Sequence, residues 1–69
     1  MAVLKEVNRV IKYTYPDLKI TAIRGDGYVY FVDGDGYRTI ESIYANPTTT
    51  STPDMTRMCV ENLADIAKQ

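Results

Sequence analysis

The chain has no histidine, no tryptophan and only one cysteine among its 69 residues. One cysteine cannot form an internal disulfide, and a zinc site needs several cysteine or histidine ligands. Without histidine the commonest general base is missing, and Cys59 stands in an apolar setting, so no nucleophile and base can be recognised. We therefore expect a protein that is not an enzyme and that needs no metal and no cofactor.

A chain of 69 residues has room for one domain. A domain this small buries only about 60% of the surface that its unfolded chain exposes, so it is marginally stable alone. Such domains commonly need a disulfide, a metal or a partner. Because neither of the first two is expected, we predict self-association, most simply as a homodimer.

Long apolar runs are also missing. No segment approaches the ~20 apolar residues that span a bilayer. Near the N-terminus, Lys5, Glu6 and Arg9 interrupt the apolar run that a signal peptide requires. A single unpaired cysteine suits a reducing compartment, so we expect a cytoplasmic protein without a membrane partner.

Acidic and basic residues nearly balance, with a formal net charge of −1, but they are unevenly placed. Residues 1–24 hold five basic and two acidic residues, a balance of +3, whereas the remainder holds three and seven, a balance of −4. A polyanion binder normally shows a clear basic excess. Nucleic-acid binding remains an alternative because the first third offers a basic stripe. Its members are Lys5, Arg9, Lys12, Lys19 and Arg24.

Hydrophobic periodicity predicts two helices that flank three strands. Both end segments carry apolar side chains at spacings of three and four, as amphipathic helices do. The middle of the chain alternates or is rich in β-branched and aromatic residues, with Gly/Asp turns between. The predicted elements are a helix at about 2–14, strands at about 18–24, 28–33 and 37–45, a loop at 46–52 and a helix at about 53–67. The sequence thus predicts one α+β domain, 1–69, of order α-β-β-β-α, with a three-stranded antiparallel meander and both helices packed on one face.

The last helix has a recognisable start. Thr52 supplies a hydroxyl that can cap the helix, Pro53 suits its first turn, and the carboxylate of Asp54 interacts favourably with the helix dipole. We therefore expect Thr52 to be the capping residue.

The two turns predict which side chains share a face of the sheet. A turn centred on residues 25–26 pairs Ile23 with Tyr28. The second turn is centred on 34–35 or on 35–36, and these registers differ by two, so both give the same faces. One predicted face holds Leu18, Ile20, Ala22, Val29, Phe31, Ile40, Ser42 and Tyr44. The other holds Lys19, Thr21, Ile23, Tyr28, Tyr30, Val32, Tyr37, Thr39, Glu41 and Ile43.

We assign the aliphatic face, centred on Phe31, to the core beneath the helices and expect the tyrosine-rich face to be open. A solvated antiparallel face is normally mostly polar, whereas tyrosine offers large contact area at low entropic cost. A contiguous patch of this kind predicts a protein-binding surface. The predicted interface residues are Tyr28, Tyr30, Tyr37, Ile23, Ile43 and Glu41. Two alternatives stay open: the tyrosines are only good strand residues that tolerate exposure, or a helix covers this face instead.

Three features that suggest other chemistry have simpler explanations. Residues 24–26 spell the integrin-binding tripeptide, but an arginine that ends a strand before a Gly-Asp turn accounts for them. Residues 33–36 begin like an EF-hand loop, yet Tyr37 and Arg38 stand where that loop needs an oxygen ligand and glycine. Glu41, among the tyrosines, is a candidate for a buried acid of raised pKa, but a paired or solvated strand residue is the simpler explanation.

The run Arg-Gly-Asp-Gly-Tyr-Val-Tyr-Phe at 24–31, followed by Thr-Ile-Glu-Ser-Ile-Tyr at 39–44, resembles a strand pattern of small phage- and prophage-encoded proteins. The resemblance covers roughly residues 18–60. That family usually has a tryptophan in its last helix, where this chain has methionines and a cysteine. The family has no assigned activity, so the resemblance implies no catalytic residue. It implies a phage accessory or host-modulating protein in a bacterial cytoplasm.

These observations favour a non-enzymatic interaction protein that binds a host protein or a second copy of itself through the tyrosine-rich face. The alternative is a small nucleic-acid-binding protein that combines its basic first helix with the sheet tyrosines.

Overall fold

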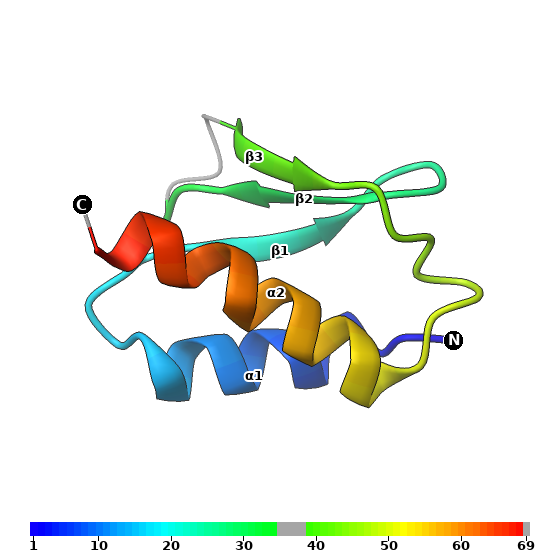
Figure 1. Cartoon of the computed structure of the whole chain (residues 1–69), viewed down its shortest axis with the longest axis horizontal. Helices are drawn as coiled ribbons and strands as arrows, with labels where there is room; N and C mark the ends of the chain where they lie inside the picture. The colour runs from blue at the N-terminus through cyan, green and yellow to red at the C-terminus, as the bar shows by residue number, and fades with distance from the viewer. Residues whose placement is uncertain (35–38, 69) are drawn as a thin grey trace.

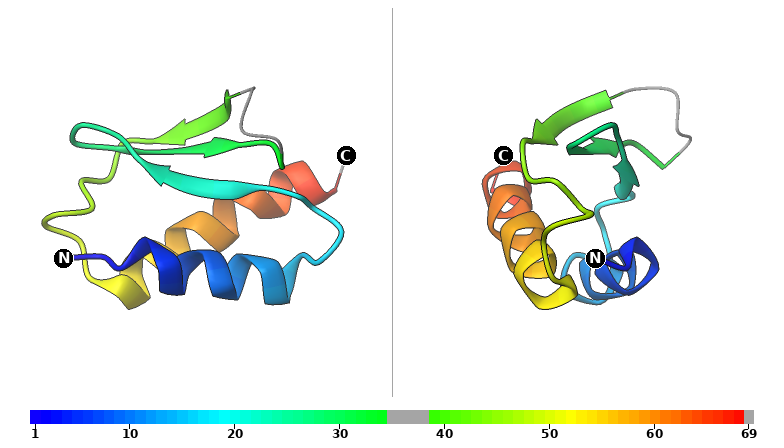
Figure 2. Two further views of the ribbon diagram at one scale, coloured as in Figure 1. Left: turned by 180° about the vertical axis from the view of Figure 1, so that it is seen from behind. Right: turned by 90° about the vertical axis from the view of Figure 1, so that its right-hand side faces the viewer.

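The computed structural model describes residues 1–34 and 39–68. Its elements are α1 (Leu4–Thr14), β1 (Thr21–Arg24), β2 (Val29–Val32), β3 (Thr39–Ile43) and α2 (Thr52–Ala67). The strands form one antiparallel sheet in the order β1-β2-β3, and both helices lie on one side of it (Figures 1 and 2). The predicted α-β-β-β-α fold is confirmed. Within the described residues, neither helix is long and apolar enough to cross a membrane.

Helix α1 turns a narrow apolar stripe toward the core. Val7 and Ile11, four residues apart and therefore on one side of the helix, are fully buried. The helix stops before Pro16, because a residue that precedes proline disfavours helical geometry, and Tyr15 leaves it with φ −128° and ψ 70°. The Tyr15 hydroxyl donates to the carbonyl oxygen of Val60 in α2 at 3.2 Å, which joins the end of one helix to the middle of the other.

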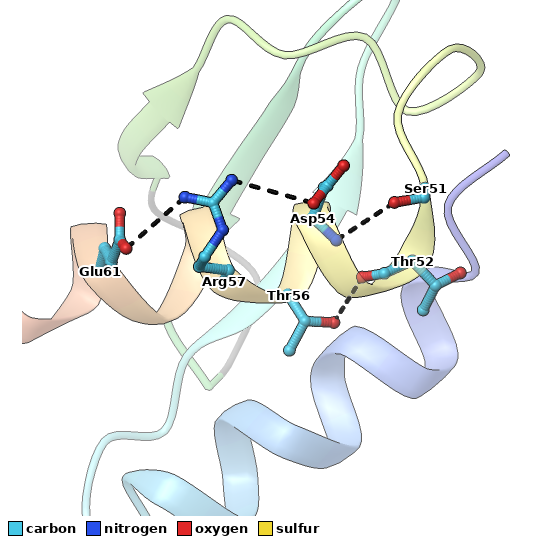
Figure 3. Close-up of polar contacts among 6 residues, drawn as sticks. All are labelled: Ser51, Thr52, Asp54, Thr56, Arg57 and Glu61. Atoms are coloured by element: carbon cyan, nitrogen blue, oxygen red, sulfur yellow. Dashed lines mark hydrogen bonds and ion pairs between the residues drawn. The ribbon is translucent and has the colours of Figure 1, made fainter.

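Helix α2 begins with a different cap from the one predicted (Figure 3). Ser51 is the N-cap, and its Oγ accepts a hydrogen bond from the backbone N–H of Asp54 at 3.3 Å. Thr52, the predicted cap, is the first helical residue. Its Oγ1 accepts instead from the backbone N–H of Val3 at 3.0 Å, so it ties the N-terminal segment to α2. On the next turn an exposed ion pair joins Arg57 to Asp54 at 3.9 Å, a contact of the kind that contributes about 0.3–0.5 kcal/mol.

The core lies between the sheet and the two helices. Phe31, the single phenylalanine of the chain, is fully buried there, and burying such a side chain contributes about 1.5–3 kcal/mol. The buried cluster consists of Ala2, Val7, Ile11, Ala22, Val29, Phe31, Met55, Cys59 and Leu63. Its strand members come from the predicted core face, so the prediction for β1 and β2 is confirmed and the alternative, helices on the tyrosine side, is wrong.

The first hairpin turns one residue later than predicted. Asp26 and Gly27 are its central residues, and Gly27 takes φ +81°, which glycine adopts without steric cost. Ile23 pairs with Tyr30 rather than with Tyr28. Because this register differs from the predicted one by two residues, every side chain of β1 and β2 keeps its predicted face.

A β-bulge in β3 overturns the prediction for that strand. Thr39 and Glu41 pair with two adjacent residues of β2, Val32 and Phe31, so Ile40 is an extra residue in the ladder. The Val32–Thr39 pair is the one that a turn centred on 35–36 predicts, although that turn lies outside the described residues. One inserted residue moves all later side chains to the opposite face.

The bulge therefore corrects four face assignments. Ile43, predicted on the open face, is half-buried and packs against the core. Glu41, also predicted on the open face, lies on the helix side of the sheet, with its side chain exposed. Ser42 and Tyr44, predicted beneath the helices, lie on the open face instead, and Tyr44 is 91% exposed.

A side chain of α1 closes the outer edge of β1. The Oδ1 atom of Asn8 accepts a hydrogen bond from the backbone N–H of Ala22 at 2.7 Å, and its Nδ2 donates to the carbonyl oxygen of Ala22 at 3.0 Å. In an antiparallel ladder alternate residues point these groups away from the neighbouring strand. The amide of Asn8 thus occupies the place of a fourth strand and anchors α1 to the sheet.

Replacing Asn8 with alanine should lower the free energy of unfolding by about 1–3 kcal/mol, because both backbone groups of Ala22 lose their partner in a partly buried position. Urea denaturation followed by circular dichroism measures this. Asn62→Ala is the matched control: its side chain donates to the carbonyl oxygen of Met58 at 2.9 Å, within its own helix. An Asn8→Ala cost no larger than the Asn62→Ala cost would contradict the anchoring role.

Candidate functional site

Three tyrosines gather on the face of the sheet that is turned away from the helices. The ring centroid of Tyr28 lies 5.9 Å from that of Tyr30 and 6.3 Å from that of Tyr44, with both ring pairs tilted by 40°. Tilted aromatic pairs at such separations are worth about 0.5–1.5 kcal/mol beyond their buried area. We call these three residues the tyrosine cluster. It joins β2 to the residue that follows β3.

The ring of Tyr28 lies over the backbone of Gly25, just beyond the end of β1. A Cβ atom at Gly25 would stand 2.6 to 2.7 Å from three atoms of that ring, closer than such atoms approach. The backbone N–H of Gly25 also donates to the carbonyl oxygen of Tyr28 at 2.8 Å. An aromatic ring that covers a glycine across two strands is a known way to stabilise sheets. Here it holds the central ring of the tyrosine cluster in position.

The same face continues from the cluster onto both neighbouring strands. Ile23 of β1 and Ser42 of β3 both pair with Tyr30, and both are half-buried. Side chains of directly paired residues share one face. The open face therefore presents an aliphatic side chain, a hydroxyl and the tyrosine cluster side by side.

The open face carries half of the predicted interface residues. The three that it holds are Ile23, Tyr28 and Tyr30. Ile43 and Glu41 lie on the helix side because of the bulge, and Tyr37 lies outside the described residues. Tyr44 takes their place, and sequence reasoning missed it because unbroken alternation along β3 puts it beneath the helices.

Most of the predicted nucleic-acid contacts lie away from the tyrosine cluster. Helix α1, which carries Lys5, Arg9 and Lys12, is on the opposite side of the sheet (Figure 2). Arg9 forms an ion pair with Glu6, with 3.1 Å between its Nη1 atom and Oε2 of the carboxylate. Arg24 donates to a backbone carbonyl of the N-terminal segment at 3.4 Å. The structure does not bring these cations and the aromatic rings together on one surface.

Two of the basic residues do come together elsewhere. Lys12 and Lys19 line an open hollow of about 350 Å³ beside the start of β1. Leu18 and Ile20 form part of its wall. The amide of Asn8 also reaches this hollow, but its oxygen and nitrogen already bond the backbone of β1. The two lysine side chains are exposed, so the hollow lacks a buried charged group that would bind an anion firmly.

The side chains considered for chemistry are not activated. Cys59 lies in the core, and burial raises the pKa of its thiol to about 11, so the thiol stays protonated at neutral pH. A buried protonated thiol is a poor nucleophile and a poor metal ligand. Glu41 is exposed rather than buried. Within residues 1–34 and 39–68, no three histidine, cysteine or acidic side chains gather as a metal site would require.

Comparisons of the chain with protein-family models, with curated proteins and with solved structures found no match. The surface feature that bears on function is the tyrosine cluster, where large aromatic side chains meet on the uncovered face of the sheet.

Replacing both Tyr28 and Tyr30 with serine should leave the protein folded and lower the free energy of unfolding by about 1–3 kcal/mol, since both rings lie outside the core and lose mainly their mutual contacts. Urea denaturation with a two-dimensional NMR spectrum measures both outcomes. Phe31→Ala is the contrast: it empties the core and should cost about 3–5 kcal/mol. If the tyrosine variant unfolds as readily as Phe31→Ala, the two tyrosines are structural.

Proposed function

We propose that this chain is a non-enzymatic interaction protein and that it binds another protein through the tyrosine cluster, extended by Ile23. The observation that carries the proposal is the composition of the uncovered face. An antiparallel sheet that turns one face to water normally makes that face polar, but this one presents Tyr28 with the rings of Tyr30 and Tyr44 beside it. Contiguous exposed patches of large side chains often mark binding sites.

The energetics of tyrosine suit this role. A tyrosine at the centre of an interface can contribute about 2 kcal/mol or more, which is roughly 30-fold in Kd. Tyr28 is held by both neighbouring rings and by Gly25 before any partner arrives, so little conformational freedom is lost on binding. Tyr44, 91% exposed, has the most surface to bury against a partner.

The chemistry of the surface limits the kind of partner. The described residues that the strand pairing puts on this face are apolar or carry a hydroxyl, and none is charged: they are Thr21, Ile23, Tyr28, Tyr30, Val32, Thr39, Ser42 and Tyr44. A partner that fits has an apolar patch with hydrogen-bonding groups at its rim, and binding should depend little on salt. The resemblance at 24–31 and 39–44 supports a phage accessory or host-modulating role, with a host protein as partner in a bacterial cytoplasm.

Nucleic-acid binding fits this arrangement less well. Single-strand platforms place aromatic rings and cations along one groove. Here the cations of α1 and the tyrosine cluster lie on opposite sides of the sheet. The salt dependence of binding separates the two functions, because phosphate contacts weaken steeply as salt rises.

Immobilised protein should capture a host protein from bacterial lysate, and the variant in which serine replaces Tyr28 and Tyr30 should lose at least about 100-fold in affinity for it, measured by titration with the purified partner. Tyr13→Ser is the matched control. It removes a tyrosine that is 88% exposed, but from α1 on the other side of the sheet, and it should leave the affinity unchanged. Equal capture by the double variant, or capture only of nucleic acid that salt releases, would refute the proposal.

A further variant perturbs the surface without removing a tyrosine. Gly25→Ala places a Cβ atom where the ring of Tyr28 now lies, and the backbone of Gly25 does not need a positive φ. It should therefore displace the central ring and weaken capture while the fold persists. Unchanged affinity in a folded Gly25→Ala protein would show that the position of Tyr28 is irrelevant to binding.

A further inference from the structure

The two outer edges of the sheet differ. The strand order β1-β2-β3 leaves one edge on β1 and one on β3. The edge of β1 is closed at Ala22 by the amide of Asn8, at 2.7 and 3.0 Å. The first three residues of β3 are exposed. An uncovered strand edge presents unpaired backbone N–H and C=O groups, which readily pair with another strand.

The hydrogen-bond pattern places the backbone groups of Ser42 on the open edge. The backbone N–H of Gly25 donates to the carbonyl oxygen of Tyr28 at 2.8 Å, so these two residues form a hydrogen-bonded pair. Hydrogen-bonded pairs alternate with non-bonded pairs along an antiparallel ladder, so the next hydrogen-bonded pair between β1 and β2 is Ile23 with Tyr30. Tyr30 therefore directs its backbone groups toward β1, and Ser42, its partner on the other side, directs its own groups away from β2. The same alternation turns Ala22 outward, where α1 meets it.

No other described residue satisfies these groups. The hydrogen bonds outside the ladders, in turns, caps and side chains of the described chain, do not involve Ser42. Within the described chain, the backbone N–H and C=O of Ser42, midway between Ile40 and Tyr44, thus remain unpaired at the edge of β3.

We propose that β3 pairs antiparallel with β3 of a second copy of this chain, about a two-fold axis at Ser42. The sheet then continues as six strands across the dimer. This inference concerns the strand edge and does not rest on the proposed function of the tyrosine cluster.

The exposed apolar residues of the sheet are symmetric about Ser42. Among its described residues, the exposed large apolar side chains at or beside a strand are Ile40, 41% exposed, and Tyr44, 91% exposed. Each lies two residues from Ser42, so an axis there sets Ile40 of each copy opposite Tyr44 of the other. An axis at Glu41 would instead oppose two carboxylates, which is unfavourable.

The asymmetry of the edges favours a closed dimer. Pairing of β3 with β1 of another copy would build an open chain of molecules, but Asn8 occupies the outward groups of Ala22. Contact between two identical edges closes after one pairing. A short strand pair is smaller than a standard interface, which buries about 800 Å² per partner, so the dimer should be weak and depend on protein concentration. A domain this small gains stability from such pairing.

Disulfide trapping tests the register. Ser42→Cys places two thiols at the axis, where paired Cα atoms lie about 5.5 Å apart, within the range that disulfides span. Glu41→Cys is the matched control, exposed on the same strand; in this register its counterpart is a diagonal neighbour about 7–8 Å away, too far to bond readily. Cys59 is buried and should not react. Ser42→Cys should form a covalent dimer at least about tenfold faster than Glu41→Cys, and equal rates would overturn the register.

Sedimentation equilibrium tests the pairing itself. The mass of the natural chain should rise from 7.8 kDa toward twice that value as protein concentration increases to about 1 mM. Ser42→Pro removes the outward N–H but no bond of the β2–β3 ladder, so it should stay monomeric. Ile40→Lys, which keeps the backbone unchanged, should do the same if the proline variant fails to fold.

The remaining outcomes separate this inference from the proposed function. A natural chain that is monomeric at every concentration yet still captures its partner would overturn the edge pairing alone. A dimer that survives Ser42→Pro and Ile40→Lys but is lost when serine replaces Tyr28 and Tyr30 would mean that two copies meet through the open face, which also overturns the edge pairing. Edge-dependent dimers without any captured partner would leave the edge pairing standing and refute the proposed function.

Discussion

The side-chain amide of Asn8 bonds both outward backbone groups of Ala22, and this places α1 directly beside the first strand. With α1 fixed there and α2 packed against it, the two helices fill one face of a sheet that has only three strands. The opposite face receives no helix, so Tyr28 and its neighbours remain open. The same two hydrogen bonds close the edge of β1 and leave β3 as the uncovered edge. One polar contact thus accounts for both surfaces through which we expect this protein to meet others.

Much of the fold could be predicted because its signals are local. Apolar spacings of three and four indicate the helices, and glycine turns between strand-forming runs indicate the meander. The first turn lies one residue beyond its predicted place, yet the faces of β1 and β2 were correct, because the resulting register shift of two preserves alternation. For the same reason Tyr28 and Tyr30 were placed on the open face and Phe31 in the core.

The rest depended on features that local patterns specify weakly. The bulge at Ile40 moved Tyr44 into the tyrosine cluster and Ile43 against the core. Its one sequence signal is the spacing of three between Ile40 and Ile43, which departs from the even spacing of apolar residues along one face of a regular strand. Asn8 was missed because a polar residue beside an apolar helix stripe looks solvated; its partner lies 14 residues away, and only tertiary packing brings them together.

Amide hydrogen exchange tests most directly whether one edge of this sheet is closed and the other open. Ala22 and Ser42 both direct their N–H groups outward from edge strands, but among the described residues only the N–H of Ala22 has an acceptor, at 2.7 Å. In dilute solution the N–H of Ala22 should exchange at least about 100-fold more slowly than that of Ser42, relative to their unfolded rates. Protection of Ser42 should then rise with protein concentration. Equal protection of the two groups at low concentration would contradict the account.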